Sequence, residues 1–402
     1  MDPSQNDATP GVSAGNTPLA DPLDDFLDYK AKTVDPESGD RSGAYAAQLE
    51  RILPTWIDWM HEHTGTEYLE GIDERTLARY PKYLARRVKA NDGDADGGIT
   101  RGTAWTYFNA VRSYLAWCVA WRDLEDNPAD SATVIDEMPD RPSRSSADQQ
   151  FWSPAQRQTL LQYVDERAHE AIDEEGSDAL APVRDRALAY LIGYAGVRGA
   201  EVLSRSDDDR DGRNGATWAD LDLENRTIDV FGKSQDDEQA PLTDKPLPAL
   251  RRWHDVLDPA SDDWPLFPTF HRPSLWGAVR EDLRDRGHDE ADVEEWLEPF
   301  DDPLEAIREF DSRPPALSTS GGRRLFKRLS DAAGVDTSED SKDYLTLHGG
   351  RRGAGEMYFR EADHSAAQRA LRHADPATTS KMYSHIEASE LSEIGSQVFG
   401  DE

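Results

Sequence analysis

Apolar residues recur along the first third of the chain at intervals of three and four positions, the spacing of one face of an α-helix. Four such segments follow one another. Their apolar positions are Leu23, Phe26 and Leu27; Leu49, Ile52, Leu53, Trp56 and Met60; Leu77, Tyr80 and Leu84; and Phe108, Val111, Tyr114, Leu115 and Cys118. The spacing predicts a small helical bundle over residues 19–135, with these side chains in its core.

A second region of regular spacing follows a break in the pattern. Residues 136–150 are polar, contain prolines and have no period, so we interpret them as an interdomain linker. The pair Ser153-Pro154 is typical of a helix start, and helices are predicted around residues 154–170 and 182–195.

This second domain, residues 151–402, also contains a segment with strand character. Thr227–Phe231 and Ala240–Leu242 flank the polar stretch Gly232–Asp237, which predicts a strand, a turn and a strand. The rest of the domain has a helical pattern, and we interpret the acidic insertion near residues 272–315 as a solvated helical surface. The predicted fold class is mainly α with a small β-sheet.

Length and composition favour a soluble protein of two domains. The chain has 402 residues, more than one typical core accommodates. Residues 1–18 are expected to be a disordered acidic tail, and they lack the basic and apolar regions of a signal peptide. The longest apolar run, Ala187–Val197, is too short to cross a bilayer, so no membrane partner is expected. A single cysteine, Cys118, excludes an intramolecular disulfide and favours a reducing cytoplasm.

The net charge of −35 is unusual for a protein that binds nucleic acid, because phosphate contacts normally require a basic surface. Either the protein avoids nucleic acid, or its acidity is an adaptation to molar intracellular salt, which screens surface repulsion within a few Å. Lysine is scarce: of 45 basic residues 9 are lysines, which leaves 36 arginines (45 − 9). We favour salt adaptation, typical of a halophilic archaeon. Net charge does not determine chemistry, so the local motifs must decide the function.

Several polar residues of the second domain carry little weight singly. In chain order they are Arg198, Glu201, Lys233, His348, Arg351, His373 and Tyr383. An Arg-Glu pair three residues apart is usually a helix-surface ion pair worth about 0.2–0.5 kcal/mol. A lysine in a hairpin is usually an exposed turn, and a tyrosine after a helical run is usually a core residue. Their joint order within one domain is more informative than any single residue.

Taken together, these motifs resemble the tyrosine recombinases of the Xer and phage-integrase type. The resemblance is carried by Gly196-Val197-Arg198-Gly199-Ala200-Glu201, by Ile228 to Lys233 with Pro241-Leu242, by His348-Gly349-Gly350-Arg351, and by Leu371-Arg372-His373 to Thr378-Thr379 and Tyr383-Ser384-His385. It covers about residues 20–395, and its C-terminal block is the most specific part. It implies an N-terminal helical core-binding (SAM-like) domain that ends near Asn127-Pro128, followed by a catalytic domain.

In that family two arginines, two histidines, a lysine and a tyrosine form the active site. Carried over motif by motif, these residues are Arg198, Arg351, His348, His373, Lys233 and Tyr383, with Glu201 as the neighbour that orients them. Arg352 stands where many members have a second histidine, so the sequence leaves open which of Arg351 and Arg352 faces the phosphate. Arg372 stands where glycine is common, and the hairpin lacks the arginine that often precedes the Pro-Leu pair.

These residue types suit phosphodiester cleavage. A tyrosine oxygen can attack phosphorus and keep the bond energy as a phosphotyrosine, so that resealing needs no ATP. Guanidinium groups stay protonated and bind phosphate oxygens through paired hydrogen bonds, in place of a metal ion. His348 and His373 would add hydrogen bonds or carry the tyrosine proton, and Lys233 would protonate the departing 5′ oxygen. No cofactor is expected.

The resemblance also implies a two-domain clamp on double-stranded DNA, with a homotetramer formed by exchange of C-terminal tails. The tail would be residues 386–399, which carry Leu391, Ile394 and Val398. Candidate phosphate contacts are Arg86, Arg87, Lys89, Arg101, Arg323, Arg324 and Lys327, each of which is equally compatible with a solvated helix face.

Three other functions are compatible with parts of the sequence. A type IB topoisomerase shares the tyrosine and arginine chemistry, and a DNA-binding relative can keep the fold without activity. A metal-dependent nuclease or transposase would use carboxylates, of which the chain has 80. His348, His373 and His385 lack the spacing and the cysteine partners of a zinc motif, so no metal site is expected.

Overall fold

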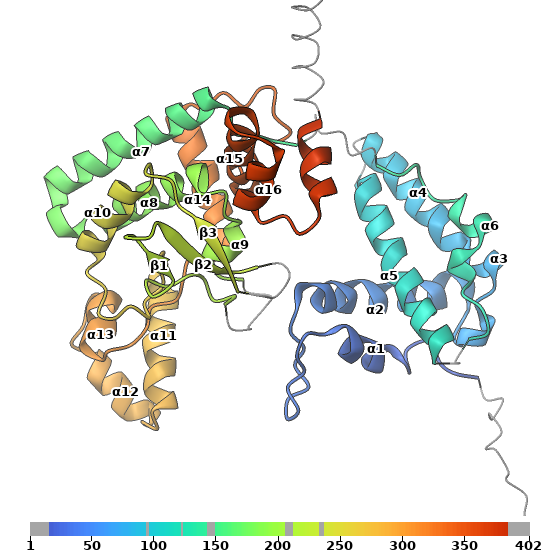
Figure 1. The fold of residues 1–402 in the computed structure, drawn as a ribbon. Coiled ribbons are helices and arrows are strands. Elements are labelled where there is room, and N and C mark those ends of the chain that lie inside the picture. Colours follow the sequence, from blue (N-terminus) through green and yellow to red (C-terminus); the bar gives the residue numbers. More distant parts are fainter. Residues whose placement is uncertain are drawn as a thin grey trace, which may run out of the picture. The chain divides into compact units, whose positions relative to one another are not determined.

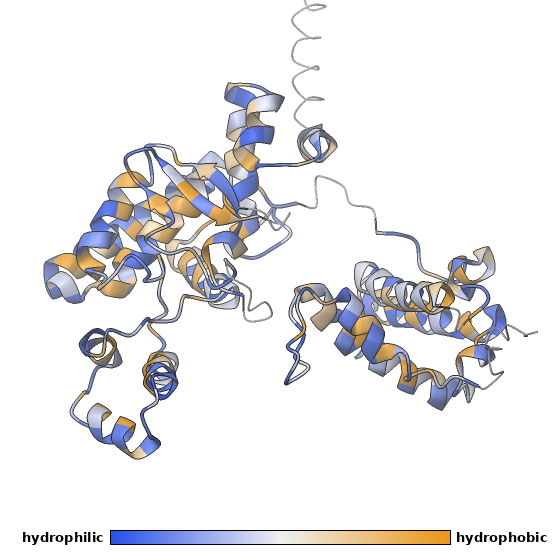
Figure 2. Ribbon diagram, turned by 60° about the horizontal axis from the view of Figure 1, so that its bottom comes forward, coloured by the Kyte–Doolittle hydropathy of each residue, from blue (hydrophilic) through white to orange (hydrophobic). Residues whose placement is uncertain are grey.

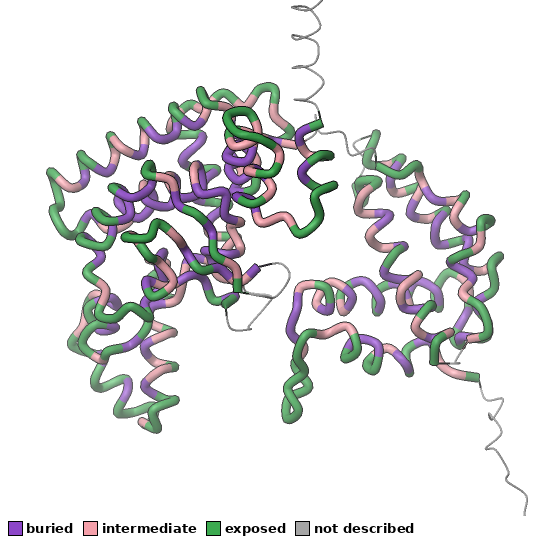
Figure 3. The backbone as a smooth tube through the Cα atoms, viewed as in Figure 1, coloured by how far each residue is buried: buried purple, intermediate pink, exposed green. Residues whose placement is uncertain are grey.

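A computed structural model of the chain describes residues 16–93, 96–121, 124–142, 149–205, 212–232 and 237–384. The chain divides into two compact units, Met1–Ser143 and Arg144–Glu402. Each unit has a buried core of its own (Figure 3). The division falls inside the stretch interpreted as a linker, whose two ends are packed: Met138 is buried in the first unit and Gln150 in the second.

The first unit is helical, and the four helices expected from the apolar spacing are present as α1, α2, α4 and α5 (Figure 1). Its helices are α1 (Leu23–Lys30), α2 (Ala44–Thr64), α3 (Glu74–Leu77), α4 (Arg79–Asp92), α5 (Arg101–Ala120) and α6 (Ala132–Ile135). Figure 2 shows the longer helices striped with hydrophobic and hydrophilic residues, as packing on one face requires.

The described chain joins the first unit earlier than expected. Thr17 and Pro18 were assigned to the disordered tail, yet the carbonyl of Thr17 accepts a hydrogen bond from Leu69 N at 2.8 Å, and Pro18 forms a β-bridge with Tyr68. Leu19 is buried, and its carbonyl accepts the hydroxyl of Tyr114 at 2.7 Å. The rest of the predicted tail, residues 1–15, lies outside the described residues.

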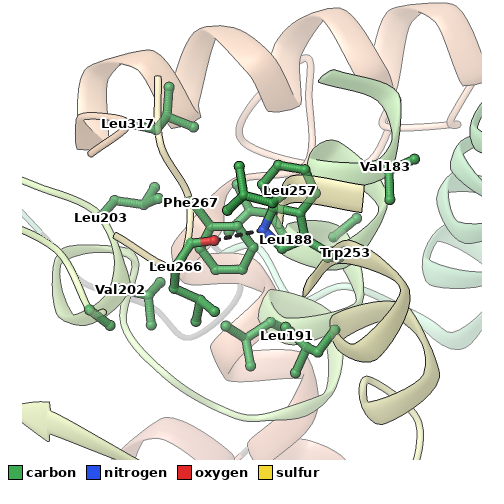
Figure 4. Close-up of a cluster of buried hydrophobic side chains, with 14 of the residues drawn as sticks. Val183, Leu188, Leu191, Val202, Leu203, Trp253, Leu257, Leu266, Phe267 and Leu317 are labelled. Atoms are coloured by element: carbon green, nitrogen blue, oxygen red, sulfur yellow. Dashed lines mark hydrogen bonds between the residues drawn. The ribbon is translucent and has the colours of Figure 1, made fainter. Parts of the chain in front are cut away.

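The second unit is built from helices around one large core. They are α7 (Pro154–Glu175), α8 (Leu180–Tyr194), α9 (Gly199–Val202), α10 (Leu247–Leu257), α11 (Arg272–Asp285), α12 (Glu290–Leu297), α13 (Pro303–Glu309), α14 (Thr319–Ala333), α15 (Leu347–Glu361) and α16 (His364–Leu371). Ser153 and Gln156 form a reciprocal capping box at the start of α7. In the core (Figure 4), the buried indole of Trp253 donates to the carbonyl of Leu266 at 2.7 Å, so its polar atom is satisfied.

A three-stranded antiparallel sheet interrupts the helices, in the order β1 (Leu221–Asp222), β2 (Thr227–Phe231) and β3 (Asp237–Pro241). Strand β2 is where the sequence predicts it. Strand β3 begins at Asp237, three residues before the predicted start, because the register continues to the pair Phe231–Asp237. Strand β1 was not predicted, since two residues are too few to show a period.

The acidic insertion forms a small lobe in which α11 contacts both α12 and α13 (Figure 1). Its leucine, isoleucine and valine side chains, among them Leu283 and Ile307, are buried, while most of its carboxylates are exposed. The chain enters and leaves the lobe at one place: Thr269 N donates to the carbonyl of Pro315 at 2.9 Å, and Pro268 forms a β-bridge with Ala316.

Candidate active site

Arg198 and Glu201 are held together by the turn that joins α8 to α9. Gly196 has a φ of 64°, which a side chain would disfavour, and it turns the chain so that Arg198 becomes the N-cap of α9. The carboxylate of Glu201 accepts both the backbone N–H of Arg198, at 2.7 Å, and its guanidinium, at 2.5 Å. Glu201 is almost fully buried, so this carboxylate orients Arg198 in an environment of reduced solvent screening.

Arg351 extends from α15 into the same cluster. Its guanidinium donates to the carbonyl of Gly196 at 2.5 Å and to the carbonyl of Leu371, and its Nη1 lies 4.0 Å from Glu201 Oε2. Burial and the charge of Arg198 lower the pKa of Arg351 to about 9, against the effect of Glu201, so it remains cationic at neutral pH. Arg352 instead directs Nη1 towards the carbonyl of Gln150, at 3.4 Å. Arg351 is therefore the arginine of this pair that lies with Arg198.

A third arginine joins the cluster, and sequence reasoning assigned it no role. Arg372 follows α16 in the left-handed conformation, with a φ of 53°. Its guanidinium donates to Glu201 at 2.5 Å and to Glu238 of β3 at 3.0 Å. Arg372 thus ties strand β3 to the carboxylate that holds the other two arginines. The only sequence signal for it is its position where glycine is common.

Both predicted histidines lie next to the guanidinium cluster. Nδ1 of His373 lies 2.8 Å from the hydroxyl of Thr379, which fixes the ring. Burial and the charges of Arg351 and Arg198 lower the pKa of His373 to about 4. Partial burial and the charges of Arg352 and Arg351 likewise lower the pKa of His348 to about 4. Both imidazoles are therefore neutral at pH 7 and can accept a proton or a hydrogen bond.

Tyr383 lies in a helical segment that begins at Pro376, and its side chain is fully buried. The phenol packs beside Phe359 and donates to the backbone carbonyl of Arg352 at 3.3 Å. Burial raises the pKa of Tyr383 well above its ordinary value, although the charge of Arg351 opposes the shift. The phenol is therefore protonated at neutral pH and withdrawn from solvent.

Two parts of the predicted site lie outside the described residues: Lys233, and the chain from His385 onwards with its predicted tail. The candidate phosphate contacts are all described. Arg86, Arg87 and Lys89 lie on α4, Arg101 begins α5, and Arg323, Arg324 and Lys327 lie on α14. Lys327 is paired with Asp343 at 2.8 Å, and Arg101 lies 3.8 Å from Asp92, so these two are already neutralised locally.

Within the described residues, no group of three or more histidine, cysteine or acidic side chains is arranged to hold a metal ion. No helix of the described chain is both long and apolar enough to span a bilayer.

Comparison with known proteins identifies the family. The family model described as the phage integrase family matches residues 158–390, which is more than half of the chain. The chain belongs to the phage integrase family. The matched region includes every residue of the cluster around Glu201, together with Tyr383. For this phage integrase the predicted fold class, mainly α with a small β-sheet, is confirmed.

Curated relatives of this phage integrase are tyrosine recombinases. XerC of Xanthomonas campestris pv. campestris (strain B100) is 24% identical over 203 residues, which are 50% of each chain. XerC of Neisseria gonorrhoeae (strain ATCC 700825 / FA 1090) is 27% identical over 236 residues, 56% of this chain and 67% of the relative. The chain spans about half the length of the curated relatives that it matches first.

Solved structures share the fold of this phage integrase. The XerH site-specific recombinase bound to a palindromic difH substrate matches with a TM-score of 0.56 and 16% identity, over 96% of this chain and 100% of that chain. The Tn1549 transposon integrase in complex with transposon right end DNA matches with a TM-score of 0.55 and 15% identity, over 94% of this chain and 100% of that chain.

Proposed function

We propose that this phage-integrase family member is a site-specific DNA recombinase. It cleaves and rejoins DNA through a 3′-phosphotyrosyl intermediate on Tyr383, without a metal ion or ATP. The observation that carries the proposal is the convergence of Arg198, Arg351 and Arg372 on the single carboxylate of Glu201, beside two neutral histidines.

The guanidinium cluster suits a phosphodiester. Two carboxylates, Glu201 and Glu238, among three guanidinium groups leave an excess of positive charge, and a phosphate brings the negative charge that balances it. Arg198 and Arg351 would donate to the two non-bridging oxygens, where charge builds up as the attacking oxygen approaches. Because Glu201 and the carbonyl of Gly196 already hold these groups in place, little reorganisation is needed during the reaction.

The reaction exchanges one phosphate ester for another. The phenol oxygen of Tyr383 attacks phosphorus, the P–O5′ bond breaks, and the 3′ phosphate remains on the tyrosine. The phenol proton passes to a neutral imidazole, His373 or His348, or to solvent, and the 5′ oxygen takes up a proton as it leaves. The family resemblance assigns that second proton to Lys233. Attack by the free 5′ hydroxyl of another strand reverses these steps and joins the two DNAs.

The nucleophile must leave its pocket before it attacks. In the described conformation the phenol donates to the carbonyl of Arg352 and has no contact with solvent. We infer that DNA binding releases the segment after Pro376 and brings the hydroxyl to the phosphate beside Arg351.

A trapped covalent adduct tests the proposal. After cleavage, a nicked duplex of randomised sequence loses the short fragment that carries the free 5′ hydroxyl, so the reaction stops at the protein–DNA ester. We expect a shifted band in a denaturing gel for the wild type in EDTA and none for Tyr383→Phe. Tyr358→Phe, which changes a partly buried tyrosine on α15, should still form the adduct.

Each outcome has a clear meaning. An adduct from Tyr383→Phe would show that the nucleophile is wrongly assigned, and dependence on a divalent ion would favour a nuclease. Sequencing the trapped DNA gives the target. With that target, exchange between two marked sites indicates a recombinase, whereas relaxation of supercoils without exchange indicates a topoisomerase.

DNA binding and assembly belong to the same proposal. The two units would close on duplex DNA as a clamp, with phosphate contacts from Arg86 and Lys89 in the first unit and from Arg323 and Arg324 in the second. Four copies would assemble on two sites by exchanging residues 386–399. The mass of the protein–DNA complex in light scattering tests this, and deletion of those residues should leave single-site binding intact while the tetramer is lost.

A further inference from the structure

The first unit contains a cavity that the proposed chemistry does not use. It lies among α2, α4 and α5 and has a volume of about 350 Å³, which is within the range of small-molecule sites. Its lining consists of Gln48, Arg51, Ile52, Thr55, Trp59, Tyr80, Tyr83, Arg87 and Tyr107.

Aromatic rings form one part of the lining. The ring centroids of Trp59 and Tyr83 are 5.2 Å apart, and those of Tyr80 and Tyr83 are 6.2 Å apart with their planes inclined by 30°. Burial, with Tyr83 and Tyr107 nearby, raises the pKa of Tyr80 far above its ordinary value, so its hydroxyl stays neutral. The cavity therefore combines ring faces with phenol hydroxyls and the amide of Gln48, which can bind the edge of a planar ring.

The charge of this cavity is opposite to that of the protein. Its lining has two arginines and no carboxylate, in a chain of 80 acidic residues and a net charge of −35. Four other cavities of the described chain each include at least one carboxylate. Arg87 uses Nε to bind the carbonyl of Gly97 at 2.7 Å, which fixes its side chain. Within the described residues, neither Arg51 nor Arg87 has a carboxylate at ion-pair distance.

We propose that this cavity binds one nucleotide unit, with its base against the aromatic lining and its phosphate between Arg51 and Arg87. Aromatic faces bind any base by stacking, and guanidinium groups bind phosphate through paired hydrogen bonds. The unit is either a free nucleotide or an unstacked nucleotide of bound DNA. The inference goes beyond the proposed function, because cleavage at Tyr383 needs no such site.

Two probes distinguish a free nucleotide from a nucleotide of bound DNA. The full chain with Tyr383→Phe, which excludes cleavage, is titrated with dAMP and with a duplex that carries one extrahelical 2-aminopurine. Stacking on Trp59 and Tyr83 should quench the 2-aminopurine fluorescence, and dAMP should quench tryptophan fluorescence. Binding of dAMP indicates a free-nucleotide site, whereas quenching of the duplex alone indicates a DNA nucleotide.

Arginine variants locate the signal in the cavity. Arg87→Gln should weaken binding of the responding probe about tenfold or more, as the loss of a charged phosphate contact predicts. Arg79→Gln, which changes an exposed arginine on the same helix, should keep it within about twofold. Arg51 is exposed, so Arg51→Gln gives a second test that does not depend on folding.

The absence of quenching with both probes, or equal effects of Arg87→Gln and Arg79→Gln, would overturn the inference. Adduct formation by the wild type is measured separately. Failure of the nucleotide site therefore leaves the assignment of Tyr383 unaffected, and the reverse also holds.

Discussion

Arg372 adopts a backbone conformation that residues other than glycine rarely adopt. An L-residue in this region is destabilised by about 1–2 kcal/mol. The side chain offsets this cost through its two ion pairs, with Glu201 and Glu238, both made in a largely buried place. We therefore interpret Arg372 as a positioning residue, which fixes Glu201 and, through it, the arginines that we propose bind the phosphate.

Replacing Arg372 by glycine should separate positioning from stability. The variant relieves the backbone strain but loses both ion pairs, so we expect little change in Tm and about a tenfold or greater loss in the rate of adduct formation. Arg369→Ala is the matched control, since Arg369 is exposed and its guanidinium binds Ser365 in its own helix. If Arg372→Gly forms the covalent adduct at the wild-type rate and binds DNA with the wild-type affinity, this role is contradicted.

The neutral histidines predict a stability that depends on pH. The pKa of His373 is about 4 in the folded chain, below its ordinary 6.5, so the fold favours the neutral ring. This contribution is fully present above pH 6.5 and is lost as the pH falls towards 4. The free energy of unfolding is measured with urea at pH 7 and at pH 4.5. Between these two pH values, it should fall by about 1 kcal/mol less in His373→Gln than in the wild type. His169→Gln, which changes an exposed histidine on α7, should behave like the wild type.

At the scale of elements, α15 is placed by its glycines. A side chain at Gly350 would have its Cβ 2.7 Å from Ile192 of α8, and one at Gly353 would be 2.6 Å from the carbonyl of Trp152. These glycines weaken the isolated helix by about 1 kcal/mol each, but they let its backbone approach α8 at Ile192 and the chain at Trp152 closely. The close approach brings Arg351 within reach of the carbonyl of Gly196.

Gly355 leaves the space that the phenol of Tyr383 occupies. A Cβ there would lie 2.1 Å from the phenol oxygen and 2.4 Å from Leu371, so Gly355→Ala should displace the tyrosine. We expect faster nitration of Tyr383 and a loss of about 1–3 kcal/mol of stability from overpacking. The adduct should still form, because the phenol has to leave this pocket in any case.

Gly277 on α11 supplies the control for this substitution. Nothing lies within 4 Å of a Cβ added there, so Gly277→Ala should leave nitration unchanged. If Tyr383 in Gly355→Ala is nitrated no faster than in the wild type, the phenol does not depend on this space.

The helices and strands were largely predictable from the sequence, whereas the contacts between side chains distant in the sequence were not. Helices α2, α4 and α5 follow from apolar residues three and four apart, because that period is local. Arg372 meets residues 171 and 134 positions away, and no local period reports such a contact. Family motifs pointed to Arg351 and His373, but they gave no role to Arg372 or Glu238. Arg372 departs from the family's motif, and Glu238 lies outside the motifs.

At the scale of the whole molecule, the charge of −35 determines how the proposed DNA binding should respond to salt. A basic protein gains affinity from released counterions and loses about 10³–10⁵ in affinity between 50 and 200 mM salt. Here the local guanidinium clusters and shape must supply more of the affinity. We expect specific binding, measured by fluorescence anisotropy, to fall less than about tenfold over that range and to persist in molar KCl. Complete loss of specific binding in molar KCl would contradict the interpretation as salt adaptation.

The lobe of α11, α12 and α13 has a consequence for how this protein can change. The chain segments that enter and leave the lobe are neighbours, joined by the hydrogen bond between Thr269 and Pro315. A segment whose ends already touch can be lengthened, shortened or exchanged without rethreading the rest of the unit. An exposed position of the lobe is thus a place to attach a fluorophore, in a segment that contributes no residue to the cluster around Glu201.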